Sequence, residues 1–319
     1  MKIRHRDIVL ITGAHGFLGQ HVLRTFLDET HCDLIVTARD EKLLFDDVAD
    51  EPQVLAYQKL DVTERNEVKE AIALYKPDVI VHCAGLVDVD RCEHDRELAW
   101  KTNVRSVEHI IEAARKTDAR MVHISSDYVF DGTRTPYAEN AVPSPLNYYG
   151  RTKLASENAL RSSGVNHCIL RGAFFYGVEV HRKPSFAINV IKALTRNETF
   201  EAFTDLYAPP TLVDDIALAV IRAVEYKKNG IYHIAGPEMI SRYEFAKRIA
   251  TAFHLNPELV IPIPFVASET RADRPRHSSF VTLKAQTELG LRITGIDEGL
   301  QVMLRGIHDM EDERQIVYQ

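Results

Sequence analysis

The feature that most limits the possible folds is a set of short, almost continuous apolar runs rich in β-branched residues. Four stand in the first 125 residues, at 8–12, 33–37, 79–83 and 121–125. Such runs are typical of strands that are covered on both faces, as in a parallel sheet packed between helices. Weaker runs predict two more strands at 54–57 and 167–171, and a possible seventh at 230–234.

Amphipathic stretches separate these strands, at 17–29, 64–75, 95–116 and 148–163. In the second stretch Val68, Ile72 and Tyr75 fall on one face of a helix. Strand and helix in alternation predict right-handed crossovers and an α/β fold with a doubly wound parallel sheet.

A glycine-rich loop follows the first predicted strand directly. Gly13, Gly16 and Gly19 are spaced by three and open the first predicted helix. The first glycine makes a tight turn, the second lets the backbone approach a pyrophosphate, and the third lets the helix pack close to the sheet. A glycine triplet alone also occurs in structural turns, but the strand before it and the helix after it favour a Rossmann dinucleotide site.

The tip of the second strand bears on the choice of cofactor. An acidic residue there binds a ribose 2′-hydroxyl and indicates NAD, whereas this strand ends in Thr37-Ala38-Arg39-Asp40. A guanidinium at Arg39 suits a 2′-phosphate, so the sequence favours NADP(H) over NAD(H). The alternative is that Arg39 lies on the adenine or in solvent and Asp40 holds the ribose. After the third strand, Asp61 is placed either to accept from an adenine amino group or to cap the helix near Glu64.

The pattern becomes less regular after about residue 171. Lys183-Pro184 and the Pro-containing run 208–210 break it, 261–264 is expected to be an extended loop, and helices are predicted at 186–195, 214–226 and 242–253. We therefore predict a Rossmann domain over 1–171, to which 212–236 returns, and a smaller mixed lobe, 172–319, that forms a cleft with it and binds substrate.

Composition excludes several classes of protein. Asp plus Glu (46) exceed Lys plus Arg (39), giving a net charge of −7 without a long basic run, so nucleic-acid binding is not expected. No apolar run approaches the roughly 18 residues of a membrane span. The four cysteines form no disulfide pattern, and a first strand at residue 8 leaves no room for a signal peptide, so a cytoplasmic location is expected.

A phenol and an ammonium stand four residues apart at Tyr149 and Lys153, on one face of a predicted helix. A nearby ammonium would lower the pKa of the phenol and suit it to acid–base chemistry, and the same lysine could hold a nicotinamide ribose. Ser125 or Ser126, at the preceding strand tip, could orient a substrate carbonyl. The pair could also be an exposed helix pair, but its position after a dinucleotide loop favours catalysis.

These motifs together resemble the extended short-chain dehydrogenases/reductases, and in particular the dTDP-4-dehydrorhamnose reductase family. The resemblance is carried by residues 12–19, 83–85, 87–93, 125–132 and 145–154, and by Arg274-Pro275. It implies that Ser126 orients the carbonyl, Tyr149 donates the proton and Lys153 supports both the tyrosine and the cofactor. Family members commonly have Thr at the position of Ser126, which keeps the hydroxyl.

The resemblance also implies two sets of binding residues and a substrate. The cofactor would contact Gly13, His15, Gly16, Phe17, Leu18, Gly19, Arg39, Asp61, Val62, Cys83, Ala84, Gly85, Asn103, Tyr149 and Lys153. The substrate would contact Val87, Ser126, Asp127, Tyr128, Phe174 and Arg274. The implied reaction is reduction of dTDP-4-dehydro-L-rhamnose at C4 with NADPH, by a possible homodimer.

Two alternatives stay open, an NAD(P)-dependent sugar-nucleotide epimerase and a non-catalytic NADP-binding regulatory subunit. A sugar-nucleotide dehydratase is not expected, because those relatives have Thr-Asp-Glu where this chain has Ser126-Asp127-Tyr128.

Other polar groups are given structural interpretations. His82, Cys83, Cys92 and His94 lack zinc-site spacing, so no metal is expected. Asn103 either lies under the active site or makes a packing hydrogen bond. Asp214-Asp215 is expected in a helix N-cap region. Arg171 and Arg274 are candidates for pairing a substrate diphosphate, with solvated surface positions as the alternative.

Overall fold

The computed structural model describes residues 7–43, 45–178, 185–266 and 270–314. The segment before residue 7, used above to argue against a signal peptide, and the Lys183-Pro184 break both lie outside these residues. None of the described helices is long and apolar enough to cross a membrane.

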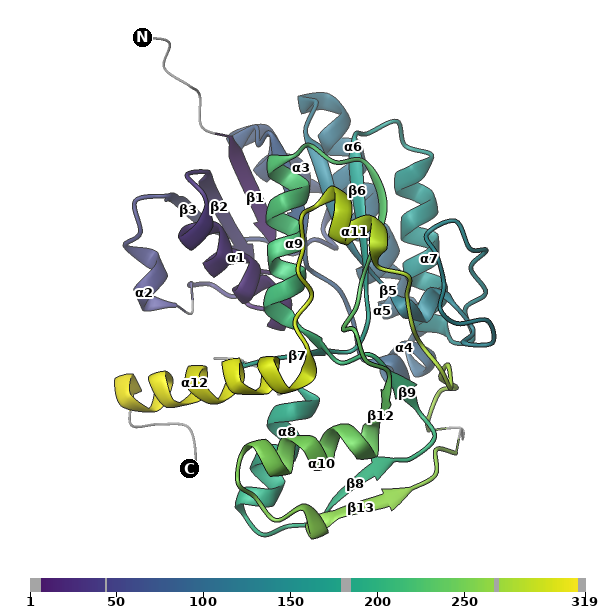
Figure 1. Cartoon of the computed structure of the whole chain (residues 1–319). Coiled ribbons are helices and arrows are strands. Elements are labelled where there is room, and N and C mark those ends of the chain that lie inside the picture. The colour runs from purple at the N-terminus through teal and green to yellow at the C-terminus, as the bar shows by residue number, and fades with distance from the viewer. Residues whose placement is uncertain (1–6, 44, 179–184, 267–269, 315–319) are drawn as a thin grey trace.

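A seven-stranded parallel sheet forms the centre of the molecule, with the strand order β11-β6-β5-β4-β1-β2-β3 (Figure 1). Its strands are β1 (Ile8–Thr12), β2 (Asp33–Ala38), β3 (Val54–Lys59), β4 (Val79–His82), β5 (Arg120–Ser126), β6 (His167–Gly172) and β11 (Gly230–Ile234). All the predicted strands are present, and the possible seventh pairs in parallel with β6. The predicted doubly wound α/β fold is confirmed.

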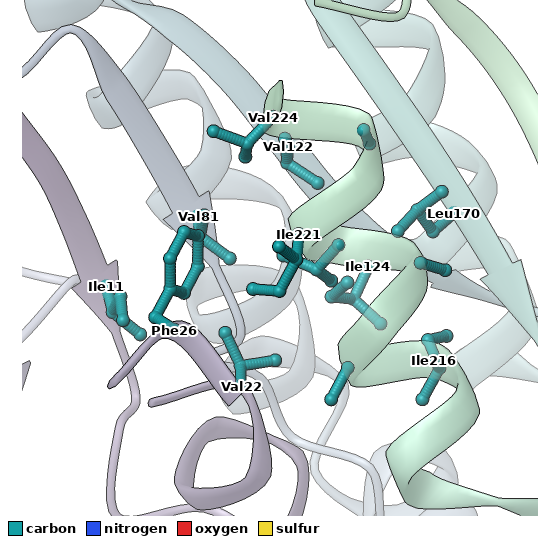
Figure 2. Close-up of a cluster of buried hydrophobic side chains, with 14 of the residues drawn as sticks. Ile11, Val22, Phe26, Val81, Val122, Ile124, Leu170, Ile216, Ile221 and Val224 are labelled. Atoms are coloured by element: carbon teal, nitrogen blue, oxygen red, sulfur yellow. The ribbon is translucent and has the colours of Figure 1, made fainter. Parts of the chain in front are cut away.

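Helices cover both faces of this sheet, which explains why the strands are apolar at successive positions. Helices α1 (Phe17–Glu29) and α9 (Val213–Glu225) pack on one face. Figure 2 shows Val22 and Phe26 of α1 and Ile221 of α9 against strand residues such as Val81 and Ile124. Helices α3 (Arg65–Tyr75), α6 (Ser106–Thr117) and α7 (Tyr148–Arg161) cover the other face, where Leu10 and Ile80 are fully buried.

The predicted helix over 95–116 is interrupted in the structure. It consists of α5 (Arg96–Trp100), a π-helical segment η1 (Lys101–Arg105) and then α6, and a short helix α4 (Val89–His94) precedes it. π-Helical turns are rare and are frequent at functional sites. Asn103 lies within this segment.

A second lobe is built around helices α8 (Phe186–Thr195), α10 (Arg242–Ala252) and α12 (Ile296–Arg314), which lie below the sheet in Figure 1. The expected loop at 261–264 is wrong, because Val260–Ile263 forms strand β13 in parallel with β8 (Phe200–Phe203). A two-stranded sheet has only edge strands, and these tolerate proline. Helices α4 and α12 were not predicted, and the domain limits at 171 and 172 stay a prediction.

Short elements complete the described chain. They are the strand pairs β7 (Phe175–Tyr176) with β10 (Thr211–Leu212) and β9 (Tyr207–Ala208) with β12 (Ile240–Ser241), the helices α2 (Asp46–Ala49) and α11 (Leu283–Glu288), and the 3-10 turns η2 (Asp127–Val129) and η3 (Pro257–Leu259).

Candidate active site

The glycine loop between β1 and α1 makes a close approach that only glycine permits. Gly13 has a φ of +68°, and a Cβ at this position would lie 2.7 Å from the Cα of Ala84, on the loop after β4. Gly16 is the N-cap residue of α1 and has no side chain to bond the first-turn amides. Amides in this arrangement favour a phosphate group, so the loop fits the pyrophosphate of a dinucleotide.

A cavity of about 280 Å³ opens at the carboxyl ends of β1 to β4. Eight predicted cofactor residues line it, namely Gly13, Gly16, Arg39, Asp61, Val62, Cys83, Ala84 and Gly85. Ala38, Leu60, Thr63, Leu86, Arg91, Leu98 and Thr102 also line it and were not predicted. Ala38, Leu60, Thr63 and Leu86 lie at a strand end or in the loop after it, where parallel sheets bind ligands, and that position is the signal that could have identified them. Arg91, Leu98 and Thr102 lie in the helical segments that follow β4.

Seven predicted cofactor residues are not in the lining of this cavity, namely His15, Phe17, Leu18, Gly19, Asn103, Tyr149 and Lys153. His15 is buried, its Nδ1 lies 2.7 Å from an Asp40 carboxylate oxygen, and its ring stacks on Tyr57. The Tyr57 hydroxyl donates to the backbone carbonyl of Asp40. Asp40 is thus held by its own neighbours, while Arg39 is exposed at the cavity wall.

Asn103 makes the packing hydrogen bonds that were one of its two sequence interpretations. Its amide oxygen accepts from the Leu86 amide at 2.7 Å, and its nitrogen donates to the Leu86 carbonyl at 2.9 Å and to the Thr152 hydroxyl at 3.0 Å. These bonds tie the loop after β4 to α7. A Cβ at Gly85 would lie 3.3 Å from the amide oxygen of Asn103 and 3.5 Å from Nζ of Lys153, so the cavity leads toward the lysine.

Asp61 does not cap helix α3. Its carboxylate accepts from the backbone amide and the hydroxyl of Thr63, which makes a local turn. The N-cap residue of α3 is Glu64, without a side-chain cap. The expected capping role is therefore wrong, because the turn at Asp61 closes two residues before the helix begins.

Ser126, Tyr149 and Lys153 come together at the end of β5 and the start of α7, and all three are buried. The Ser126 hydroxyl lies beside the Tyr149 phenol, donates to Asp127 at 2.9 Å and accepts from the Tyr128 amide at 3.2 Å. Nζ of Lys153 donates to the Ile124 carbonyl at 3.0 Å and lies 5.9 Å from the centre of the Tyr149 ring. Of the two candidate serines, Ser125 instead bonds Glu157, away from the phenol.

Burial dominates the titration of this pair. Burial raises the pKa of Tyr149, and the hydrogen bond with Ser126 opposes it only partly. Burial also lowers the pKa of Lys153 to about 8. The expected net lowering of the pKa of Tyr149 is therefore absent from this structure, because burial in a low-dielectric site penalises both charged forms. At neutral pH Tyr149 is protonated and holds the proton that a donor needs.

Among the predicted substrate residues, Tyr128 and Asp127 adjoin the candidate catalytic set and Val87 is exposed. Tyr128 is in contact with Tyr149, edge to face with ring centres 5.6 Å apart. Asp127 is buried and bonded to the hydroxyls of Ser126 and Ser278, and burial raises its pKa. Val87 is 68% exposed on the loop before α4.

Arg242 lies on the substrate side of the site and was not predicted from the sequence. The Arg242 guanidinium lies over the ring of Phe174 and close to Tyr128 and Asp127. The signal was present, since Ser241 and Glu244 form a capping box that makes Arg242 the first residue of α10.

Arg171 is neither a diphosphate ligand nor a surface residue. It is buried in an ion pair with Glu157, whose two carboxylate oxygens accept from Nε at 2.8 Å and Nη2 at 2.6 Å. Nη1 contacts His233 on β11 at 3.2 Å. This arginine therefore joins β6, β11 and α7 behind the site.

The carboxylates of Asp214 and Asp215 lie in the first turn of α9 and do not cap it. Asp214 contacts Nδ1 of His21 at 2.6 Å, and Asp215 accepts from the amide and hydroxyl of Thr294. The predicted N-terminal helix region is correct, but the carboxylates do not satisfy its free amides, because each bonds a residue from another part of the chain.

The histidines and cysteines near β4 have structural environments. Among the residues that the model describes, no group of three His, Cys, Asp or Glu side chains could hold a metal. The His82 ring bonds the Thr12 hydroxyl, and burial lowers its pKa to about 3. Burial raises the pKa of the Cys83 thiol to about 12, so the thiol stays protonated beside the cofactor cavity.

Comparison with known proteins agrees with this geometry. A family model described as the RmlD substrate binding domain matches residues 7–308. The methionine adenosyltransferase 2 subunit beta of Mus musculus is 33% identical over 306 residues, covering 92% of this chain and 86% of the relative. The dTDP-4-dehydrorhamnose reductase of Aggregatibacter actinomycetemcomitans is 30% identical over 300 residues, covering 89% of this chain and 94% of the relative.

A solved structure gives the same result at the level of the fold. The crystal structure of dTDP-4-dehydrorhamnose reductase from Bacillus anthracis str. Ames, in complex with NADP, is similar with a TM-score of 0.81 and 27% identity, covering 96% of this chain and all of the other. The chain therefore belongs to the RmlD substrate-binding-domain family, within the dTDP-4-dehydrorhamnose reductase-like extended short-chain dehydrogenases/reductases.

Proposed function

We propose that this chain is an NADPH-dependent reductase of the C4 carbonyl of a nucleotide-linked 4-keto-6-deoxysugar, and specifically that it converts dTDP-4-dehydro-L-rhamnose to dTDP-L-rhamnose. The observation that carries the proposal is the buried set of Ser126, Tyr149 and Lys153 at the end of a dinucleotide cavity. The reductase named among the relatives supports the choice of sugar.

The dinucleotide would be held by the loop at Gly13 and Gly16, by Arg39 and by the cavity wall up to Gly85. When bound, it supplies the hydride that adds to the carbonyl carbon. The Ser126 hydroxyl can rotate from Asp127 toward the carbonyl oxygen and orient it. Tyr149 then gives its phenolic proton to that oxygen, which becomes the new hydroxyl. Lys153, with a pKa of about 8, stabilises the phenolate that forms.

Two observations support NADPH over NADH. Arg39 is exposed at the wall of the cavity, where a guanidinium would pair with a 2′-phosphate. The carboxylate of Asp40, which could bind a free ribose, is engaged by His15. The relative from Bacillus anthracis was solved with NADP.

A coupled assay tests the proposal. dTDP-4-dehydrorhamnose is generated in place, and loss of NADPH is followed at 340 nm. We expect stoichiometric oxidation of NADPH by the wild-type chain and no turnover by Tyr149→Phe. Turnover only of a different 4-keto sugar nucleotide would refute the sugar and keep the chemistry. An epimerase would instead recycle a tightly bound NAD.

A second candidate function rests on the relative named as a methionine adenosyltransferase subunit. In that case the chain would bind NADP and a partner enzyme without reducing any sugar. NADP binding without turnover of any keto sugar would favour this candidate, whereas turnover that survives unchanged in Tyr149→Phe would contradict the proton-donor role of Tyr149. The cytoplasmic location and the homodimer stay predictions.

A further inference from the structure

Two arginines approach the substrate side of the site, and only one of them has a carboxylate partner. Arg274 pairs with Asp90 at 2.8 Å and donates to the Ala272 carbonyl at 2.7 Å. Asp90 also accepts from the Ala272 amide. The charge of Arg274 is therefore neutralised, and its contacts fasten residues 272–274 to helix α4.

Arg242 is placed rigidly but lacks such a partner. The capping box of Ser241 and Glu244 fixes the first turn of α10, and the Arg242 amide donates to the Leu206 carbonyl. Within the described part of the chain, Nη1 of Arg242 is buried without a hydrogen-bond partner, and no carboxylate forms an ion pair with the guanidinium. Burial lowers the pKa of Arg242 to about 10, so it is still a cation at neutral pH.

A buried donor on a charged group is costly unless something accepts from it. The plane of this guanidinium is set by the Phe174 ring beneath it. Phe174 has a φ of +38°, which is unusual for a bulky residue, and its ring packs against Phe186 and Phe245. The aromatic support and the unsatisfied nitrogen together describe a site for an anionic ligand.

The location of Arg242 relative to the proton donor identifies which anion this is. Arg242 lies close to Tyr128, whose ring contacts that of Tyr149, and close to Asp127, which bonds Ser126. In a nucleotide-linked 4-keto sugar the diphosphate is attached at C1, across the sugar ring from the C4 carbonyl. A carbonyl at Tyr149 therefore leaves the diphosphate about one sugar ring away, and we assign it to the side of Arg242 because that guanidinium has the unsatisfied donor.

We propose that Arg242 binds the diphosphate of the nucleotide sugar, while Arg274 is a structural tether to Asp90. This inference rests on the proposed function. A planar guanidinium can donate two parallel hydrogen bonds to phosphate oxygens. A lysine ammonium at the same place would not reproduce this pair of bonds.

The test is isothermal titration of thymidine diphosphate, uridine diphosphate and thymidine into the NADPH-loaded protein. We expect Arg242→Ala to weaken diphosphate binding by about 10–100-fold and to leave the affinities for thymidine and NADPH unchanged, since one charge-assisted pair is lost. Arg242→Lys should retain part of the affinity. Arg248→Ala, an exposed arginine on the same helix paired with Glu238, is the matched control and should bind as wild type does.

Arg274→Ala should lower the Tm and change diphosphate affinity less than Arg242→Ala does. Wild-type affinity for a diphosphate in Arg242→Ala would overturn the assignment, as would equal binding of thymidine and thymidine diphosphate by the wild type. If Arg242→Ala does not fold, the same comparison is made with Arg242→Lys. A different result would contradict the proposed function, namely that diphosphates bind but NADPH is not oxidised with any 4-keto sugar nucleotide.

Discussion

The cofactor side and the substrate side of this site are built in different ways. The cofactor cavity is formed at the ends of consecutive strands, and its main requirement is a backbone that comes close, as at Gly13 beside Ala84. The substrate side is formed by side chains from distant parts of the chain, including Tyr128, Phe174, Arg242 and Ser278. A local sequence motif is therefore enough to predict the cofactor side. The substrate side cannot be predicted in this way, because it depends on how the second lobe packs against the sheet.

The largest expected effect comes from the residue at the boundary of the two regions. Tyr149→Phe removes the proton donor, and we expect kcat to fall by about 100–10,000-fold. Affinity for NADPH and for thymidine diphosphate should change little, because the substitution removes one hydroxyl and keeps the aromatic ring. Stopped-flow turnover and fluorescence titration measure the two quantities. A parallel loss of NADPH affinity would show that the two regions are not separable at this residue.

The next effect concerns the buried network behind the site. Arg171→Ala leaves the Glu157 carboxylate buried without its partner, and we expect the free energy of unfolding to fall by about 3–5 kcal/mol. Arg222→Ala removes a more exposed pair with Glu225 on α9 and should cost about 0–1 kcal/mol. Urea denaturation compares the two variants. Equal losses would contradict the assignment of Arg171 as the link between β6, β11 and α7.

Arg39→Ala tests how the cofactor side distinguishes NADPH from NADH. Loss of one charge-assisted pair should weaken NADPH binding by about 10–100-fold and leave NADH binding nearly unchanged. Lys42→Ala, another exposed cation on the same loop, serves as the control. Tighter or equal binding of NADH by the wild-type chain would remove the argument from Arg39 and leave the fold intact.

The last effect is the pH dependence of stability from Lys153. Its pKa is 10.5 in a model compound and about 8 in the folded chain, so between these values the unfolded chain binds more protons. The free energy of unfolding should therefore rise with pH from about 8 to 10, by up to about 1.4 kcal/mol per pH unit. Lys153→Met should abolish this rise. Above pH 10 the raised pKa of Tyr149 acts in the opposite direction, since the folded chain then keeps the extra proton.

The sequence by itself determined the sheet, the glycine loop and the candidate catalytic residues. Four of the seven strands were found from continuous apolar runs, because burial on both faces leaves that signature in each strand separately, and the other three were predicted from weaker runs. Gly13 and Gly16 were found because the turn needs glycine at fixed positions after a strand. Tyr149 and Lys153 were found from their spacing on one helix. All of these patterns are local, so they can be read without knowing what else lies nearby.

Only the tertiary structure decided the roles of the arginines. Arg171, Arg242 and Arg274 are chemically identical in the sequence, and two of them were candidates for the same diphosphate. Their roles differ because Glu157 reaches the first, Asp90 reaches the third, and no described carboxylate pairs with Arg242. The environment of the Asp40 carboxylate also depends on the tertiary structure, since its bond to His15 joins residues 25 positions apart. A charge acquires its function from its neighbours, and those neighbours are brought together only when the chain folds.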